Sequence, residues 1–130
     1  MIVIDASALV EALIPDPRGD RVRRRIVDSG ATLHAPELID LEVTHALRRH
    51  ERMRALSSRR ATEAVATLRR IRLNRYPHAL FLSRIWELRN NLTTYDAAYV
   101  ALAEVLAAPL LTMDRRLAHA SGVRAVVEVA

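Results

Sequence analysis

The sequence predicts an α/β fold: a three-layer α/β/α sandwich with a central parallel sheet of about five strands and a protruding helical hairpin. Short segments rich in Ile, Val and Leu alternate with longer segments of helical periodicity. Parallel strands in such an alternation need helical crossovers, which cover both faces of the sheet. Two successive helical segments have no strand between them, which predicts the hairpin.

Strands are expected where a short apolar run is bounded by Pro, Gly or Asp: at residues 2–4, 32–35, 73–76, 110–112 and 125–129. The third run, in "RLNRYPHALF", can be divided in several ways. Helices are expected at residues 6–13, 20–28, 37–53, 58–71, 79–88 and 94–106, with a short one after Asp114. The helices at 37–53 and 58–71 form the hairpin, which we expect to stand off the sheet.

The size and composition predict one domain spanning residues 1–130, because 130 residues that are 51% hydrophobic fit a single compact core. The absence of Cys excludes disulfides, thiolate metal sites and Cys nucleophiles, and it fits a reducing cytoplasm, the location we expect. No membrane partner is expected. Asp5 interrupts the N-terminal apolar run, and Glu104 and Pro109 break the longest one, so neither a secretory signal nor a membrane span is predicted.

The charge of the chain indicates a nucleic-acid partner. The 20 basic residues are all Arg, and the net charge is +5. Because the planar guanidinium suits bidentate contact with phosphate, a basic surface of this kind fits RNA or DNA, although codon usage can also produce an Arg-only chain. The absence of Lys excludes phosphate-loop nucleotidases and receiver-type phosphate sites, which depend on a Lys.

Four carboxylates occupy informative positions in the predicted fold. Asp5 ends the first strand, and Asp114 follows the strand in "PLLT". Each of these two can be explained as a helix N-cap, a role that Ser7 can share with Asp5. Asp96, in "NLTTYDAAYVALAE", fits a capping box that starts at Thr93. Glu42 lies inside the helix of "PELIDLEVTHAL", where no cap explains it.

The positions of these four acids in the predicted fold favour one shared site. Ligands of open parallel sheets bind at the carboxyl ends of the strands, where all four side chains can converge. Four carboxylates a few Å apart cannot all stay ionised without a compensating charge, so the group implies bound cations or raised pKa values. Oxygen donors without His or Cys select Mg²⁺ or Mn²⁺ over Zn²⁺.

The segments around these acids are "IDASAL", "PELIDLEVTHAL", "LTTYDAAYVALAE" and "LLTMDRRL". They resemble the motifs of the PIN-domain nucleases, in particular the toxin half of VapBC-type toxin–antitoxin pairs, and the resemblance spans essentially the whole chain. It implies a PIN-like fold and a metal-dependent endoribonuclease whose catalytic, metal-binding residues are Asp5, Glu42, Asp96 and Asp114. Ser7 and Thr112 match supporting hydroxyl positions. Some relatives have a further acid where this chain has Arg116, which leaves open whether one or two ions bind.

A cation held by carboxylates lowers the pKa of a bound water and neutralises charge on the scissile phosphate, so hydroxide can attack in line. The resemblance implies products with a 5′-phosphate and a 3′-hydroxyl. We expect Asp5 with Asp96 or Asp114 to contact the ion, and Glu42 to act through water. The arginines expected to bring RNA to this acidic pocket, against the alternative of ordinary helix-surface charge, are Arg48, Arg49, Arg52, Arg54, Arg115 and Arg116.

The resemblance also implies a partner, an antitoxin that restrains the nuclease. The apolar segment "ALFLSRIWEL" can serve this partner or a homodimer, with Trp86 either an interface anchor or a core residue. The alternative function is a catalytically silent nucleic-acid or partner-binding domain on the same fold. A phosphatase with an Asp nucleophile is disfavoured, because it needs a second Asp at the position of Ser7 and a Lys.

Overall fold

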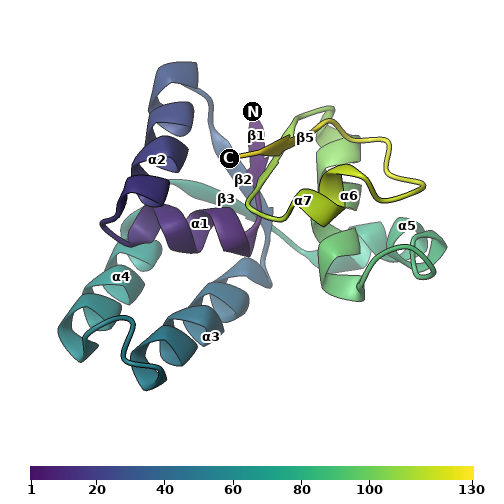
Figure 1. The fold of residues 1–130 in the computed structure, drawn as a ribbon. Helices are drawn as coiled ribbons and strands as arrows, with labels where there is room; N and C mark the ends of the chain where they lie inside the picture. The colour runs from purple at the N-terminus through teal and green to yellow at the C-terminus, as the bar shows by residue number, and fades with distance from the viewer.

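In the computed structural model, which describes residues 1–130, a five-stranded sheet lies between two helical layers (Figure 1). Its strands are β1 (Ile2–Ile4), β2 (Leu33–Pro36), β3 (Leu73–Tyr76), β4 (Leu110–Thr112) and β5 (Val127–Val129), arranged in the order β3-β2-β1-β4-β5. Every neighbouring pair is parallel. The predicted fold class is confirmed, and each expected strand is found within two residues of its predicted ends.

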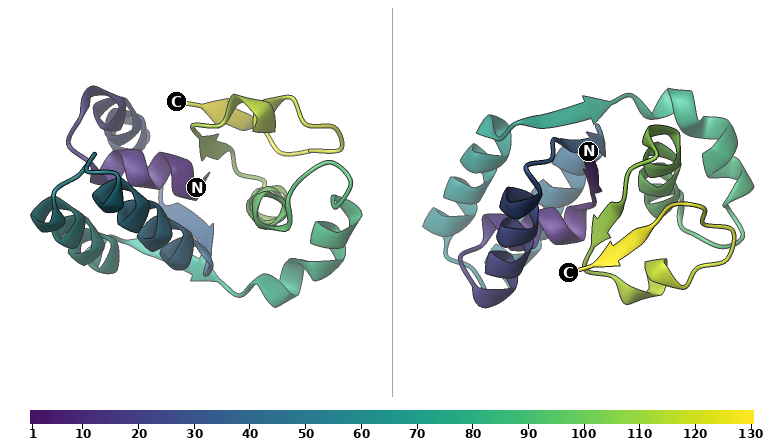
Figure 2. Two further views of the ribbon diagram at one scale, coloured as in Figure 1. Left: turned by 60° about the horizontal axis from the view of Figure 1, so that its bottom comes forward. Right: turned by 90° about the horizontal axis from the view of Figure 1, so that it is seen from above.

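The helices are α1 (Ala6–Leu13), α2 (Pro17–Ser29), α3 (Ile39–Arg52), α4 (Ser58–Arg70), α5 (Leu82–Glu87), α6 (Thr94–Leu106) and α7 (Arg115–Ala118), with a 3₁₀ helix η1 (His78–Phe81) before α5. Figures 1 and 2 show α1 to α4 grouped on one side of the sheet and α5 and α6 on the other. None of these helices combines the length and the apolar character needed to cross a membrane.

The core is built around β1 and α6, which therefore fix the centre of the molecule. All three residues of β1 are buried, as expected of a central parallel strand. In α6, every residue from position 97 to position 103 is buried. Four of these seven are Ala, whose small side chains let the helix backbone lie close to the sheet. Acidic residues at the ends of β1 and α6 are consequently held by the most rigid part of the fold.

Most helix ends lie within two residues of the predicted ones, and two helices differ more. Helix α2 begins at Pro17 and not at position 20, because the side chain of Asp16 caps it by accepting a hydrogen bond from the Gly19 amide at 2.8 Å, and Pro17 suits the first turn. The helix expected at 79–88 is divided into η1 and α5. The backbone of Phe81, with φ −110° and ψ 4°, leaves helical geometry between the two.

The predicted hairpin consists of α3 and α4. Its inner surface is apolar and buried, with Val43, Leu47 and Ala64 among the core residues. Figure 1 shows its tip projecting from the body of the molecule. Arg54 in the connecting turn adopts the left-handed conformation with φ 57°, a role more often taken by Gly. The hairpin packs along its inner face against α1 and not on the sheet, and its tip projects furthest from the molecule.

Helices α1 and α2 approach each other closely at Gly19, which is buried. A Cβ atom at this position would overlap the Glu11 carbonyl oxygen and lie 2.6 Å from that of Ile14. These are backbone atoms of the α1 C-terminus, where Arg23 donates hydrogen bonds to the carbonyls of Ala12 at 2.7 Å and Ile14 at 3.2 Å. The lack of a side chain at position 19 thus allows the α1–α2 turn to close.

We expect Gly19→Ala to destabilise the protein by about 1–3 kcal/mol, because the backbone must shift to admit the methyl group. Thermal unfolding followed by circular dichroism should show a melting temperature lower by roughly 3 °C or more. Gly30→Asn is the control, since Gly30 has φ 60° and open space around it, and Asn tolerates this conformation. Equal melting temperatures for Gly19→Ala and the unaltered chain would contradict the close approach.

Candidate functional site

Asp5 lies directly after β1 and is only 5% exposed. Its Oδ1 accepts hydrogen bonds from the Ser7 hydroxyl at 2.6 Å and from the Ala8 amide at 3.0 Å, and its Oδ2 accepts one from the Thr112 hydroxyl. The bond from Ala8 makes Asp5 the N-cap of α1. A helix cap and a site residue are therefore compatible roles for Asp5, because one oxygen caps the helix while the carboxylate also faces the ends of the strands.

The hydrogen-bonding capacity of Asp5 is not exhausted. A carboxylate offers about four lone-pair positions, and three protein donors occupy three of them. One position, on Oδ2, has no partner within the protein. Burial raises the pKa of Asp5, and the charge of Asp96 raises it further. A buried anion with a free lone pair and a raised pKa is suited to binding a cation.

Two hydroxyl groups connect the end of β1 to the end of β4. The Ser7 hydroxyl, which binds Asp5, accepts a hydrogen bond from the Met113 amide at 3.0 Å. The Thr112 hydroxyl likewise binds Asp5 and accepts from the Asp114 amide at 3.0 Å. Ser7 and Thr112 therefore fix the Asp5 carboxylate relative to the segment that bears Asp114.

Glu42 lies in the first turn of α3, half-buried, and its Oε1 accepts a hydrogen bond of 2.7 Å from the Tyr99 hydroxyl. Tyr99 is buried in α6, three residues after Asp96. Sequence patterns alone do not mark Tyr99 as a positioning residue for Glu42. The available signal was its spacing from Asp96, which places both side chains on one face of the helix.

Asp96 and Asp114 line a shallow cavity of about 220 Å³, together with Arg116 and the end of the loop before α6. Thr93 caps α6 by accepting a hydrogen bond from the Asp96 amide at 3.2 Å, which confirms the predicted cap and leaves the Asp96 carboxylate at the first turn of the helix. Asp114 caps α7 by accepting from the Arg116 amide at 2.9 Å. It also forms an ion pair with the Arg116 side chain.

The charges of the four carboxylates influence one another. Burial raises the pKa values of Glu42 and Asp96, as it does that of Asp5. The negative charges of Asp96 and Asp5 raise that of Glu42 further, and Asp114 acts in the same way on Asp96. Only Asp114 has a lowered pKa, because the Arg116 guanidinium beside it donates hydrogen bonds to its carboxylate. Asp96 is thus electrostatically linked to each of the other three acids.

The donor set fits a hard divalent cation. The groups are oxygen donors only, and none of the three with raised pKa values forms an ion pair with a basic side chain. The side chains do not, however, form a compact cage, since no three acidic or imidazole groups lie close enough together to hold an ion as they stand. This arrangement suits Mg²⁺, which keeps several waters and needs only one or two carboxylates.

The predicted RNA-binding arginines fall into two groups. Arg116 lies at the site, and Arg115 is exposed beside it at the start of α7. Arg48, Arg49 and Arg52 lie in the last turns of α3, exposed. With a helical rise of ~1.5 Å per residue, the six to ten residues from Glu42 to these arginines span about 9–15 Å. The structure therefore separates the hairpin arginines from the carboxylates.

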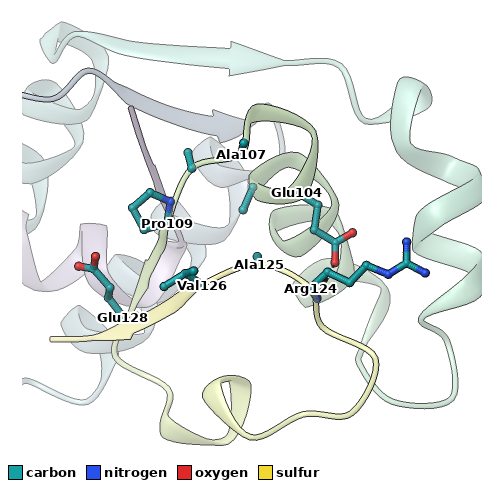
Figure 3. Close-up of a pocket in the computed structure, with 9 residues that line it drawn as sticks. Glu104, Ala107, Pro109, Arg124, Ala125, Val126 and Glu128 are labelled. Atoms are coloured by element: carbon teal, nitrogen blue, oxygen red, sulfur yellow. Dashed lines mark hydrogen bonds between the residues drawn. The ribbon is translucent and has the colours of Figure 1, made fainter.

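A separate cavity of about 670 Å³ lies at the other end of the sheet, around the segments that enter β4 and β5 (Figure 3). Its wall includes Pro109, Val126 and two carboxylates, and each carboxylate is already paired. Glu104 accepts from Arg84 at 2.8 Å, and Glu128 accepts from Arg25 at 2.8 Å. None of the four candidate acids contributes to this cavity.

Trp86 was expected either at an interface or in the core. It lies at the surface of α5 with 67% of its area exposed, and the guanidinium of Arg89 stacks on its ring with 4.4 Å from the Arg89 Cζ to the ring centroid. Leu82, one turn earlier in α5, is also exposed. The core interpretation of Trp86 is therefore wrong.

Comparisons with known proteins show the family to which the chain belongs. The PIN domain family model matches residues 2–123. Ribonuclease VapC12 of Mycobacterium tuberculosis is 40% identical over 129 residues, covering 99% of this chain and 98% of that protein. The crystal structure of VapC20 from Mycobacterium tuberculosis, described as a sarcin-ricin loop cleaving toxin, superposes with a TM-score of 0.71 at 17% identity, covering 97% of this chain and 98% of that one.

VapBC2 from Rickettsia felis, crystallised with a DNA fragment from its promoter, superposes with a TM-score of 0.70 at 14% identity, covering 99% of this chain and 98% of that one. At such low identities the two structural matches concern the fold alone. The family model and VapC12 cover nearly the whole chain at the level of sequence. The chain therefore belongs to the PIN domain family, and to its VapC branch.

Proposed function

We propose that this protein is a Mg²⁺- or Mn²⁺-dependent endoribonuclease that acts as the toxin of a toxin–antitoxin pair. The support from comparison is its close relative VapC12, which is named a ribonuclease. The observation that carries the proposal is the electrostatic coupling of Asp96 to Asp5, Glu42 and Asp114, three of these four acids having raised pKa values. A bound dication would reduce the mutual repulsion of these carboxylates.

In this proposal, Asp5 with Asp96 or Asp114 holds the ion. When bound there, such an ion would supply a Lewis acid that lowers the pKa of a water molecule and offsets the charge that develops on the scissile phosphate. Ser7 and Thr112 keep the Asp5 carboxylate in one orientation through the hydrogen bonds described above. Each of these residues thus has one task, either to bind the cation or to restrain a residue that does.

Glu42 has a different task. Tyr99 holds its Oε1, and burial raises the pKa of Glu42 above that of an ordinary Glu. A carboxylate of this kind suits proton transfer from the attacking water, since the efficiency of a general base increases as its pKa approaches the working pH. The other oxygen, Oε2, is the one available for this transfer.

The proposed partners follow from charge and from the family. Arg115 and Arg116 would meet the RNA backbone at the site, and RNA that extends along α3 would reach Arg48, Arg49 and Arg52. A restraining antitoxin is proposed because VapBC2, a match in fold, is named as a pair. A homodimer stays a prediction, with Leu82 and Trp86 as candidate contacts. We expect the protein to act in the cytoplasm.

We expect cleavage of a mixed cellular RNA substrate to depend on divalent cation. EDTA should abolish product formation on a gel, and excess Mg²⁺ or Mn²⁺ should restore it, whereas excess Ca²⁺ or Zn²⁺ should restore much less. Cleavage that continues at full rate in EDTA would contradict the metal dependence. Binding of RNA without cleavage in Mn²⁺ would favour the silent-domain alternative.

Asp96→Asn should lower cleavage by at least ~100-fold, because several kcal/mol of charge stabilisation depend on the cation. The control Asp28→Asn makes the same charge change at an exposed residue of α2 and should leave activity within about twofold of the unaltered chain. Initial rates on one synthetic RNA measure both. Wild-type rates for Asp96→Asn would exclude this residue from the site.

The same variant should not be destabilised at pH 7 in EDTA. Because the folded-state pKa of Asp96 is raised, ionisation costs stability as pH rises from the unfolded pKa through the folded one, and a neutral Asn avoids that cost. Thermal melts should therefore give an equal or higher melting temperature for Asp96→Asn, with the difference disappearing as pH falls below the unfolded pKa. A clearly lower melting temperature at pH 7 would show that the Asp96 carboxylate has a structural role.

Tyr99→Phe should reduce cleavage roughly ten- to a hundredfold, as removal of a group that orients a site residue does elsewhere. The Phe ring fills the same buried volume, so the fold should persist with a cost of about 1 kcal/mol for the lost hydrogen bond. Tyr76→Phe is the matched control, because it also removes a phenol hydrogen bond, to His34 at 2.7 Å. If the two variants lose activity equally, the Tyr99–Glu42 contact has no special role.

A further inference from the structure

Arg116 is bound to Asp114 by three hydrogen bonds. Its amide donates to Oδ1 at 2.9 Å, its Nε donates to Oδ1 at 3.2 Å, and its Nη2 donates to Oδ2 at 3.0 Å. The guanidinium therefore makes a two-pronged ion pair in which both oxygens of Asp114 are engaged. This is the geometry that makes Arg–carboxylate pairs specific.

The field of this guanidinium extends beyond Asp114. Burial raises the pKa of Asp96, which lines the same cavity of about 220 Å³, and the charge of Arg116 offsets part of that rise. One Arg side chain thus opposes two of the four negative charges that a dication would use. No other basic side chain forms an ion pair with any of the four acids.

The Arg116 side chain can move away from Asp114 without breaking any other hydrogen bond. It is 91% exposed, and Asp114 is its only hydrogen-bond acceptor. Arg84 provides a contrast, because its guanidinium is held by Glu87, by Glu104 and by the carbonyl of Gly122. Exposed ion pairs such as that of Arg116 are weak enough for a dication to displace.

We propose that Arg116 is an internal counter-ion of the carboxylate site, which competes with the divalent cation for Asp114 and is displaced when the cation binds. This inference rests on the proposed cation site and adds its regulation. Competition arises because Asp114 cannot give both oxygens to a guanidinium and also bind a dication at full strength, and because the two positive charges repel each other. The cation concentration at which the site fills is then set by Arg116 as well as by the acids.

The test is Mn²⁺ binding to RNA-free protein, measured by the loss of the free-Mn²⁺ electron paramagnetic resonance signal. We expect Arg116→Gln to bind Mn²⁺ about three- to tenfold more tightly than the unaltered chain in low salt. Arg116→Lys, which keeps the charge but loses the two-pronged geometry, should lie between the two. The difference between Arg116→Gln and the unaltered chain should shrink at about 0.5 M NaCl, because salt screens exposed charges.

Arg115→Gln is the matched control, since it removes the same charge from the neighbouring exposed residue, which forms no ion pair. It should change the Mn²⁺ affinity by less than about twofold. Equal affinities for Arg116→Gln and the unaltered chain, or equal tightening by Arg115→Gln, would overturn the proposal. If instead the unaltered chain binds no Mn²⁺, or if Asp96→Asn leaves binding unchanged, the proposed cation site fails, and the counter-ion role fails with it.

Discussion

The structure depends on a buried negative charge at the end of its central strand. Asp5 follows a strand with no exposed side chains, and a carboxylate in that position is costly unless it is hydrogen-bonded or neutralised. Ser7, Ala8 and Thr112 meet part of this requirement. Their donors still leave the pKa of Asp5 raised, because the effect of burial outweighs these hydrogen bonds.

The surrounding elements bring further carboxylates to the same edge of the sheet and do not neutralise the charge of Asp5. The parallel sheet brings the segment after β4 beside the end of β1, and α6 places Asp96 at the same edge. Tyr99 orients Glu42 from α3 towards the group, because its hydroxyl spans the two helices. Only Arg116 opposes the negative charge, from an exposed position. The stability of the folded chain and the proposed binding of a cation are therefore coupled through the same few groups.

Sequence patterns were sufficient for the parts of the fold that follow from local chemistry. Asp5 and Asp114 could be placed at strand ends because short apolar runs precede them, and the Thr93 cap of α6 could be read from its spacing. The start of α2 was missed, although Asp16 and Pro17 are a normal cap and first residue. The contact of Tyr99 with Glu42 and the pairing of Arg116 with Asp114 depend on side-chain placement, which periodicity does not determine.

The most direct test of the account is a crystal of this protein soaked in Mn²⁺ and measured at a wavelength where manganese scatters anomalously. We predict an anomalous peak about 2 Å from a carboxylate oxygen of Asp5 and close to Asp96 or Asp114. A fully occupied peak elsewhere with none beside Asp5, at Mn²⁺ concentrations that support cleavage, would contradict it.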